Sequence, residues 1–294
     1  MNGQMAFSFE EAPCGPTTSV GGSTRFFTGF SEERMNRREF LARTAFFLIG
    51  GFLKVDELPK AQAFDDLNSD SATEPRISLI IDDIGPNLSG AKWFLDLNIP
   101  ITFAVLPRLC KSEEAATLVH DAGHEIMLHQ PMEPDDRHLD PGPGALFVGY
   151  GSNKIVKIME ENISLIPFAA GVNNHMGSRF TRYSGEVLET LQVVKEKGLF
   201  FVDSLTTGRS KAYETARNLN MPAVSRNVFL DNILEESAIV HQLSLLKKRA
   251  LKQGHSVGIG HPFPETARAI RSFLKEPGDA GFTWVYVSRL IENG

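Results

Sequence analysis

Two adjacent carboxylates, Asp82 and Asp83, follow the apolar run 77–81 and precede Gly85. An unbroken apolar run of this kind is typical of a strand buried on both faces, and a glycine permits a sharp turn after it. Neighbouring residues of a strand point to opposite faces, so the two carboxylates are expected to have different tasks. One would bind a metal ion while the other accepts a proton; a pair of solvated loop residues is the alternative.

Three of the eight histidines, His129, His175 and His261, stand where other predicted strands end. Glu133 follows His129 after four residues, and the intervening Pro131 is incompatible with a helix, so a turn after a strand must present both side chains. Imidazole and carboxylate ligands together suit one divalent ion such as zinc, with a coordination position left for water. The residue types therefore predict a metal site.

Other polar residues also stand at predicted strand ends. Asn174 directly precedes His175, and Asp203 and Asp231 follow two further apolar runs. These side chains would orient the ligands through hydrogen bonds, contact a substrate, or simply cap their strands. In a barrel of parallel strands the C-terminal ends share one face, where active sites lie. So many polar strand ends favour a site on that face.

The elements that would position these groups alternate along the chain. Strands are expected at 77–81, 101–106, 125–128, 169–172, 199–202, 224–230, 256–259 and 283–287. Helices are expected at 112–122, 153–166, 184–197, 235–253 and 265–274. This alternation predicts an α/β fold with a mostly parallel sheet, open or closed into a barrel, in a single domain over residues 76–294.

The composition is that of an ordinary globular protein. Of the 294 residues, 42% are hydrophobic and 22% charged, which argues against collagen, a coiled coil or wholesale disorder. The net charge of -6 leaves no basic footprint for a nucleic-acid partner. No apolar run reaches the roughly 18 residues needed for a stable membrane span.

The N-terminal part differs from the rest and resembles an export signal. Residues 1–34 have no helical or strand period and are expected to be a disordered tail or a mis-annotated start. Arg37 and Arg38, the apolar stretch 45–53 and the small residues of 61–63 then follow in the order of a twin-arginine signal peptide over 35–63. Residues 64–75 read as a linker. This order predicts export to the periplasm or another extracytoplasmic compartment; an amphipathic helix packed on the domain is the alternative.

Several stretches resemble a known family in the right order. Three of them are similar to motifs of the NodB-like polysaccharide deacetylase superfamily: residues 81–85, residues 123–126 leading to His129, and residues 260–262. Three others are similar to its divergent polysaccharide deacetylase branch: residues 128–134, 174–178 and 201–204. The resemblance implies a distorted barrel of seven or eight β/α units. It also implies a hydrolase that removes N-acetyl groups from an aminosugar polymer such as a peptidoglycan-type glycan.

The same resemblance implies individual roles. Asp82 would be the general base and His261 the general acid, while Asp83 and His129 would bind the metal. Ordinary members carry a second histidine four residues after the first, where this chain has Glu133. The third metal ligand is therefore expected to be His175 or, alternatively, Glu133.

Two other functions compete with deacetylation. A glycoside hydrolase would use two carboxylates, for instance Asp82 and Asp231, without a metal. It would leave the three histidines at strand ends unexplained. An envelope protein that only binds a glycan or a protein partner would keep the barrel without turnover, and the missing second histidine of the family pattern favours this alternative.

Overall fold

The computed structural model describes residues 74–275 and 281–291. The predicted tail, the predicted export signal and all but the last two residues of the predicted linker lie outside the described residues. Within the described part, no helix is both long and apolar enough to cross a membrane.

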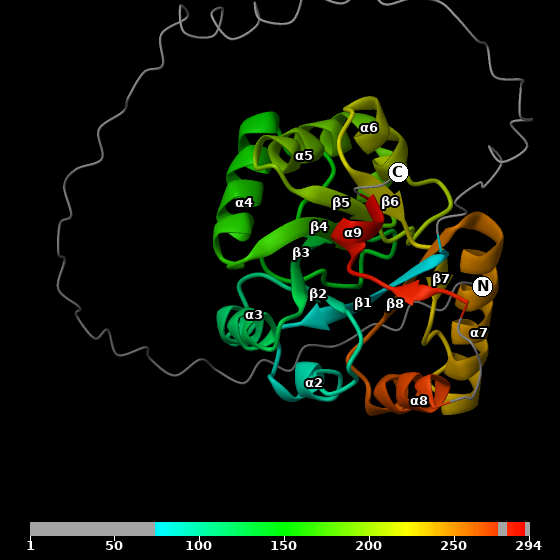
Figure 1. The fold of residues 1–294 in the computed structure, drawn as a ribbon. Helices are drawn as coiled ribbons and strands as arrows, with labels where there is room; N and C mark the ends of the chain where they lie inside the picture. Colours follow the sequence, from blue (N-terminus) through cyan, green and yellow to red (C-terminus); the bar gives the residue numbers. More distant parts are fainter. Residues whose placement is uncertain (1–73, 276–280, 292–294) are drawn as a thin grey trace, which may run out of the picture. The chain divides into compact units, whose positions relative to one another are not determined.

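One sheet of parallel strands forms the centre of this domain, with the order β6-β5-β4-β3-β2-β1-β8-β7 and β9 beside β1. Figure 1 shows the strands at the centre and the larger helices around them. The strands are β1 (Arg76–Ile84), β2 (Thr102–Val105), β3 (Glu125–Met132), β4 (Ala169–Met176), β5 (Phe200–Asp203), β6 (Ala223–Ser225), β7 (Val228–Phe229), β8 (His255–Gly260) and β9 (Thr283–Trp284). The predicted α/β barrel is confirmed.

The two ends of this strand order belong to one short segment. β6 pairs with β5 and β7 pairs with β8, and only Arg226 and Asn227 separate β6 from β7. The backbone N–H of Arg226 donates to Asp203 (3.0 Å), and that of Asn227 donates to Val257 (2.9 Å). The segment predicted as one strand over 224–230 therefore changes partner halfway, and this change distorts the barrel.

All the helices except α9, which follows the last strand, lie in the connections between strands, as the alternation predicts. They are α2 (Ser89–Lys92), α3 (Ser112–Asp121), α4 (Ser152–Ser164), the 3₁₀ turn η1 (Phe180–Arg182), α5 (Ser184–Glu196), α6 (Ala212–Asn218), α7 (Glu236–Gln253), α8 (Pro264–Leu274) and α9 (Val287–Ile291). Helix α7 ends where Gly254 adopts a left-handed conformation, and α8 begins with a proline, which suits the first helical turn.

The predicted strand over 283–287 is too long at its C-terminal end. Only Thr283 and Trp284 are a strand, and Val287 begins helix α9. Val287 and Leu290 lie three residues apart on one helical face, and both are buried with the inward-facing residues of the barrel, such as Ile80 and Val257. Packing inside the barrel therefore overrides the β-branched character of this segment.

Helix α9 covers the N-terminal end of the barrel. The backbone N–H of Val287 donates to Thr102 Oγ1 and that of Ser288 to Glu125 Oε1. Thr102 and Glu125 are the first residues of β2 and β3. The C-terminal ends of the strands are at the opposite end, which α9 leaves uncovered.

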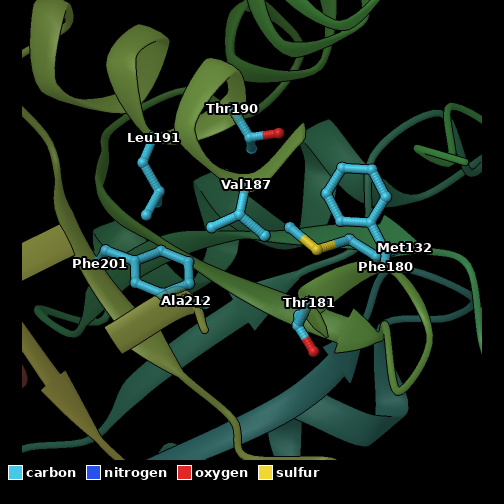
Figure 2. A pocket seen from close by; sticks show the side chains of 8 residues that line it. All are labelled: Met132, Phe180, Thr181, Val187, Thr190, Leu191, Phe201 and Ala212. Carbon is cyan, nitrogen blue, oxygen red and sulfur yellow. The ribbon is translucent and has the colours of Figure 1, made fainter. Parts of the chain in front are cut away.

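A small cavity lies under helix α5, and its walls are apolar (Figure 2). Its two hydroxyl groups, on Thr181 and Thr190, donate to the backbone carbonyls of Gly177 and Glu186 and so are already paired. The other lining residues are Met132, Phe180, Val187, Leu191, Phe201 and Ala212. The cavity is a packing gap of the outer core with no titratable side chain.

Candidate active site

The end of β1 brings both aspartates to the same place. Ile81 pairs with Phe103 while Ile84 pairs with Val105, so three steps along β1 match two steps along β2, as in a β-bulge. Asp83 lies at this irregularity with a left-handed φ of 57°. The expectation that the two carboxylates face opposite sides of the sheet is therefore wrong, because it assumed a regular strand.

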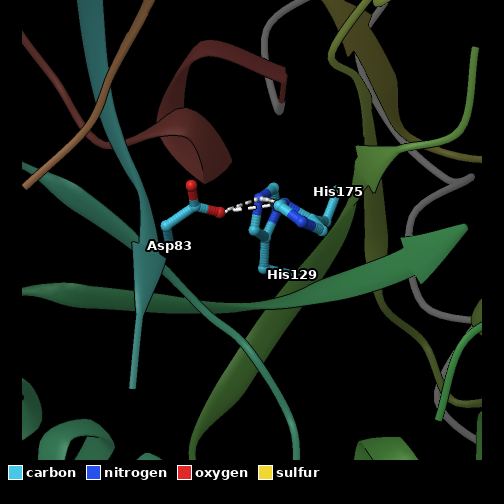
Figure 3. A group of neighbouring side chains, drawn as sticks. All are labelled: Asp83, His129 and His175. Carbon is cyan, nitrogen blue, oxygen red and sulfur yellow. Dashed lines mark hydrogen bonds and ion pairs between the residues drawn. The ribbon is translucent and has the colours of Figure 1, made fainter. Parts of the chain in front are cut away.

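Asp83, His129 and His175 form a buried cluster at the C-terminal ends of β1, β3 and β4. Asp83 Oδ1 lies 3.1 Å from His129 Nε2 and 2.9 Å from His175 Nδ1. The two imidazole nitrogens are 3.2 Å apart. Figure 3 shows the carboxylate pointing at both rings. Among the described residues, these three are the group of ligand type that converges on one point.

The cluster fits a divalent cation. Bonds of about 2.0–2.1 Å in tetrahedral coordination place neighbouring ligand atoms about 3.4 Å apart. The three separations of 2.9, 3.1 and 3.2 Å are slightly shorter and need only a small expansion. Asp83 Oδ1 is also buried and accepts no hydrogen bond of good geometry from the described residues. Two nitrogens and one carboxylate oxygen are the donor set of many zinc sites.

The protonation of the cluster follows from its charges. Burial raises the pKa of Asp83, but His175, His129 and His261 together outweigh burial and hold this pKa well below its usual range. Burial lowers the pKa of His129, whereas Asp82 and Asp83 raise it more, so the net shift is upward. A metal ion must therefore displace a proton from a histidine whose pKa is raised, which makes its affinity weaker at low pH.

Asp82 lies beside the cluster, 3% exposed, with Oδ2 3.6 Å from His129 Nε2. Its Oδ1 accepts a hydrogen bond of 2.8 Å from Asn173 Nδ2. Burial raises the pKa of Asp82 more than the nearby His129 and His261 lower it. A carboxylate with a raised pKa is the type of group that serves as a general base.

His261 also lies beside the cluster, with Nε2 3.9 Å from Asp83 Oδ2. Its Nδ1 lies 2.9 Å from Asp231 Oδ1, while Asp231 Oδ2 accepts hydrogen bonds from the backbone of His261 and from Thr266. Burial lowers the pKa of His261, but the hydrogen bond and charge of Asp231 outweigh it and raise this pKa to about 9. The imidazole is therefore protonated at neutral pH.

Asn174 and Asp203, two of the candidate site residues, form hydrogen bonds with loop residues and do not contact the cluster. Asn174 Nδ2 donates to the backbone of Met176, and its Oδ1 accepts from the backbone of Ser204. The carboxylate of Asp203 caps the loop before α6 by accepting from residues 205, 210 and 213. Both side chains tie together the ends of β4 and β5.

Glu133 has other partners and is not part of the cluster. Its Oε1 lies 3.1 Å from Arg179 Nε, and its Oε2 accepts a hydrogen bond from the backbone of Val148. These contacts fasten the loop after β3 to the loop after β4. Of the two candidate third ligands, the structure places His175 with Asp83 and His129.

Sequence reasoning missed Asn173. Its Oδ1 lies 2.7 Å from His129 Nδ1 while its Nδ2 donates to Asp82, so it touches both a cluster residue and its neighbour. The signal was present in the alternation of strand side chains. Asn173 is two residues from His175 and shares its face of β4, whereas Asn174 points to the other face.

The fold and the site define a class of protein: a parallel β/α barrel with a candidate metal site, the buried His-His-Asp cluster, at its C-terminal mouth. The sequence model of the family "Divergent polysaccharide deacetylase" matches residues 79–291. The chain belongs to this family, as the motifs at the strand ends predict.

Two curated sequences and one solved structure are similar to this chain. The chain is 31% identical over 202 residues to the uncharacterized protein YibQ of Escherichia coli K12, a match that covers 68% of this chain and 62% of YibQ. It is 27% identical over 205 residues to an uncharacterized protein of Haemophilus influenzae, covering 70% of this chain and 73% of the relative. The crystal structure of the uncharacterized protein ATU2773 from Agrobacterium tumefaciens C58 superposes with a TM-score of 0.70 at 24% identity, covering 74% of this chain and 89% of the other.

Proposed function

We propose that this protein is a metal-dependent carbohydrate deacetylase that removes N-acetyl groups from an aminosugar polymer of the cell envelope. One observation carries the proposal: a carboxylate of raised pKa, Asp82, and a protonated imidazole, His261, lie 3.6 Å and 3.9 Å from atoms of the Asp83–His129–His175 cluster. Metal-assisted hydrolysis of an amide uses a metal ion, a base that takes a proton from water and an acid that protonates the departing amine, all within reach of one substrate. The family match supports the carbohydrate substrate, and the predicted signal peptide supports the envelope.

Asp83, His129 and His175 would hold the metal ion, with zinc the best fit to their two nitrogens and one oxygen. A bound divalent ion of this kind polarises the amide carbonyl and lowers the pKa of a water molecule. The protein's own task is to hold the three ligand atoms within a buried site that excludes bulk water.

Asp82 and His261 would move the protons. Asp82 Oδ2 faces the cluster, since Oδ1 is held by Asn173, and this free oxygen accepts the proton of the attacking water. His261 Nε2 faces the cluster, since Nδ1 is held by Asp231, and it donates its proton to the departing amine. Each transfer contributes roughly 10²–10⁴-fold to the rate.

The hydrogen bonds of Asp231 argue against the metal-free glycoside hydrolase. Its Oδ1 is engaged with His261 and its Oδ2 with the His261 backbone and Thr266. A carboxylate so engaged offers neither a free nucleophilic oxygen nor a dissociable proton. The paired aspartates Asp82 and Asp231 are therefore poor candidates for two-carboxylate chemistry.

The proposal is tested by acetate release from N-acetylated chitin oligosaccharides and from peptidoglycan, with zinc-loaded protein. We expect turnover by the wild type and, for Asp82→Asn, retained zinc with turnover reduced by about 10²–10⁴-fold because an amide cannot accept the proton. Bound zinc without acetate release from any such polymer would favour the glycan- or protein-binding alternative. New reducing ends without zinc would favour the glycoside hydrolase.

The third ligand is tested in the same assay. His175→Ala should lose zinc, because it removes one of the three converging donor atoms. Glu133→Gln should keep zinc, since Glu133 is engaged with Arg179 and Val148. The reverse pattern would identify Glu133 as the ligand.

A further inference from the structure

We infer that Asn173 is a positioning residue that sets two groups at once: the tautomer of the metal ligand His129 and the orientation of the base Asp82. This inference rests on the proposed metal-dependent function and adds to it a residue outside the ligand and proton-transfer sets. Asn173 is wholly buried in β4, and its two amide atoms contact two different partners.

The donor and acceptor roles follow from chemistry without any observed hydrogen atom. An ionised carboxylate only accepts hydrogen bonds, so the amide atom that faces Asp82 Oδ1 at 2.8 Å must be the NH₂ group of Asn173. The carbonyl oxygen of Asn173 then faces His129 Nδ1 at 2.7 Å. A carbonyl oxygen only accepts, so His129 Nδ1 must carry the proton.

This assignment prepares His129 to bind a metal. In a neutral imidazole with the proton on Nδ1, Nε2 carries the free lone pair. Nε2 is the nitrogen that lies 3.1 Å from Asp83 Oδ1 and 3.2 Å from His175 Nδ1. The Asn173 carbonyl therefore directs the lone pair of His129 into the cluster and resists rotation of the ring.

The same amide orients Asp82. Its NH₂ group holds Oδ1, and this contact leaves Oδ2 toward the cluster, 3.6 Å from His129 Nε2. The distance between base and ligand is therefore set by one side chain rather than by two independent contacts. Asn173 is a short, rigid link between the metal ion and the group that takes the proton.

Two substitutions separate the two contacts. Asn173→Asp is nearly isosteric and still accepts from His129 Nδ1, but it places a second carboxylate against Asp82. Asn173→Ala removes both contacts. Asn174→Ala is the matched control, since among residues 74–275 and 281–291 the side chain of Asn174 bonds to the Met176 and Ser204 backbones and not to the cluster.

The first measurement is zinc affinity by competition with a chromophoric chelator, with zinc as the only ligand. We expect Asn173→Ala to bind zinc about 10–100-fold more weakly, the usual effect of removing a hydrogen bond to a metal-bound histidine. Asn173→Asp should bind zinc at least as tightly as the wild type, because a carboxylate also accepts from Nδ1. Asn174→Ala should lose stability but keep its zinc affinity.

The second measurement is acetate release by the zinc-saturated proteins. Asn173→Asp should lose at least tenfold in kcat with little change in KM, because its zinc is bound but Asp82 is repelled from its position. A variant that is merely destabilised would not combine wild-type zinc affinity with a reduced kcat.

Wild-type zinc affinity in both folded Asn173 variants would overturn the role toward His129, and wild-type kcat in Asn173→Asp would overturn the role toward Asp82. If Asn173→Ala does not fold, weaker zinc binding by Asn173→Asp than by the wild type would also overturn the inference.

The wild type separates this inference from the proposed function. If wild-type protein binds zinc but releases no acetate, the proposed deacetylase activity fails, and the role of Asn173 toward Asp82 fails with it. The zinc affinities of the variants would still decide the role toward His129. A wild type that binds no zinc would overturn both.

Discussion

Burial favours the neutral form of a histidine, and the partly buried His261 keeps its proton because of one neighbour. Burial alone lowers its pKa, whereas the hydrogen bond and charge of Asp231 raise it to about 9. Asp231 is itself fixed by Thr266 and by the His261 backbone. The general acid of the proposed reaction is therefore a pair of side chains at the ends of two neighbouring strands.

Removing the charge of Asp231 should move the pH dependence of turnover. A general acid works only while protonated, so wild-type activity should fall as the pH rises through about 9. In Asp231→Asn the pKa of His261 falls, and the alkaline limb of kcat should shift to lower pH. A pH–rate profile measures the shift.

The matched control is Asp203→Asn, which neutralises a carboxylate at another strand end whose hydrogen bonds come from residues 205, 210 and 213. Its alkaline limb should stay in place even if its stability falls. An unmoved limb in Asp231→Asn, or an equal shift in both variants, would show that His261 is not the acid.

At the scale of the element, the alternation of side chains between the two faces of a strand predicts which residues face the site. Polar residues after apolar runs mark the approach of β1, β3, β4 and β8 to the barrel mouth, because buried parallel strands are apolar until they reach it. The predicted ends at 81, 128 and 172 are too early, since these strands continue to residues 84, 132 and 176. The period of two also distinguishes Asn173, which faces the cluster, from Asn174, which does not. The bulge at Asp83 has no such pattern, since it depends on how β1 pairs with β2, and the sequence of β1 alone does not specify this register.

Helix α9 illustrates how tertiary packing decides an element. Its β-branched start favours a strand, but its buried face fills the N-terminal end of the barrel interior. Leu290 is 3% exposed there, so Leu290→Ala should lower the free energy of unfolding by about 2–5 kcal/mol in urea denaturation. Leu251→Ala, at a half-exposed position on α7, should cost less than about 0.5 kcal/mol. Equal costs for the two variants would contradict the packing role of α9.

At the scale of the whole molecule, the site exists only when the barrel is assembled. The cluster joins β1, β3 and β4, and His261 with its partner Asp231 adds the ends of β8 and β7. An unfolded chain holds none of these ligands together, so metal binding and folding stabilise each other. The predicted twin-arginine signal is compatible with this dependence, because that resemblance implies export in the folded state, which would allow a metal to be loaded before export.

This route gives a prediction for the complete chain. Replacing Arg37 and Arg38 together with lysine should leave the protein uncut after residues 61–63 and retained in the cytoplasm, because the receptor reads the arginine pair itself. Arg43→Lys changes a neighbouring arginine outside the pair and should be exported and processed normally. Cell fractionation and the mass of the N-terminus measure both outcomes. Normal cleavage of the double variant would contradict a twin-arginine route and leave export of the unfolded chain, in which case the metal must enter the assembled barrel after translocation.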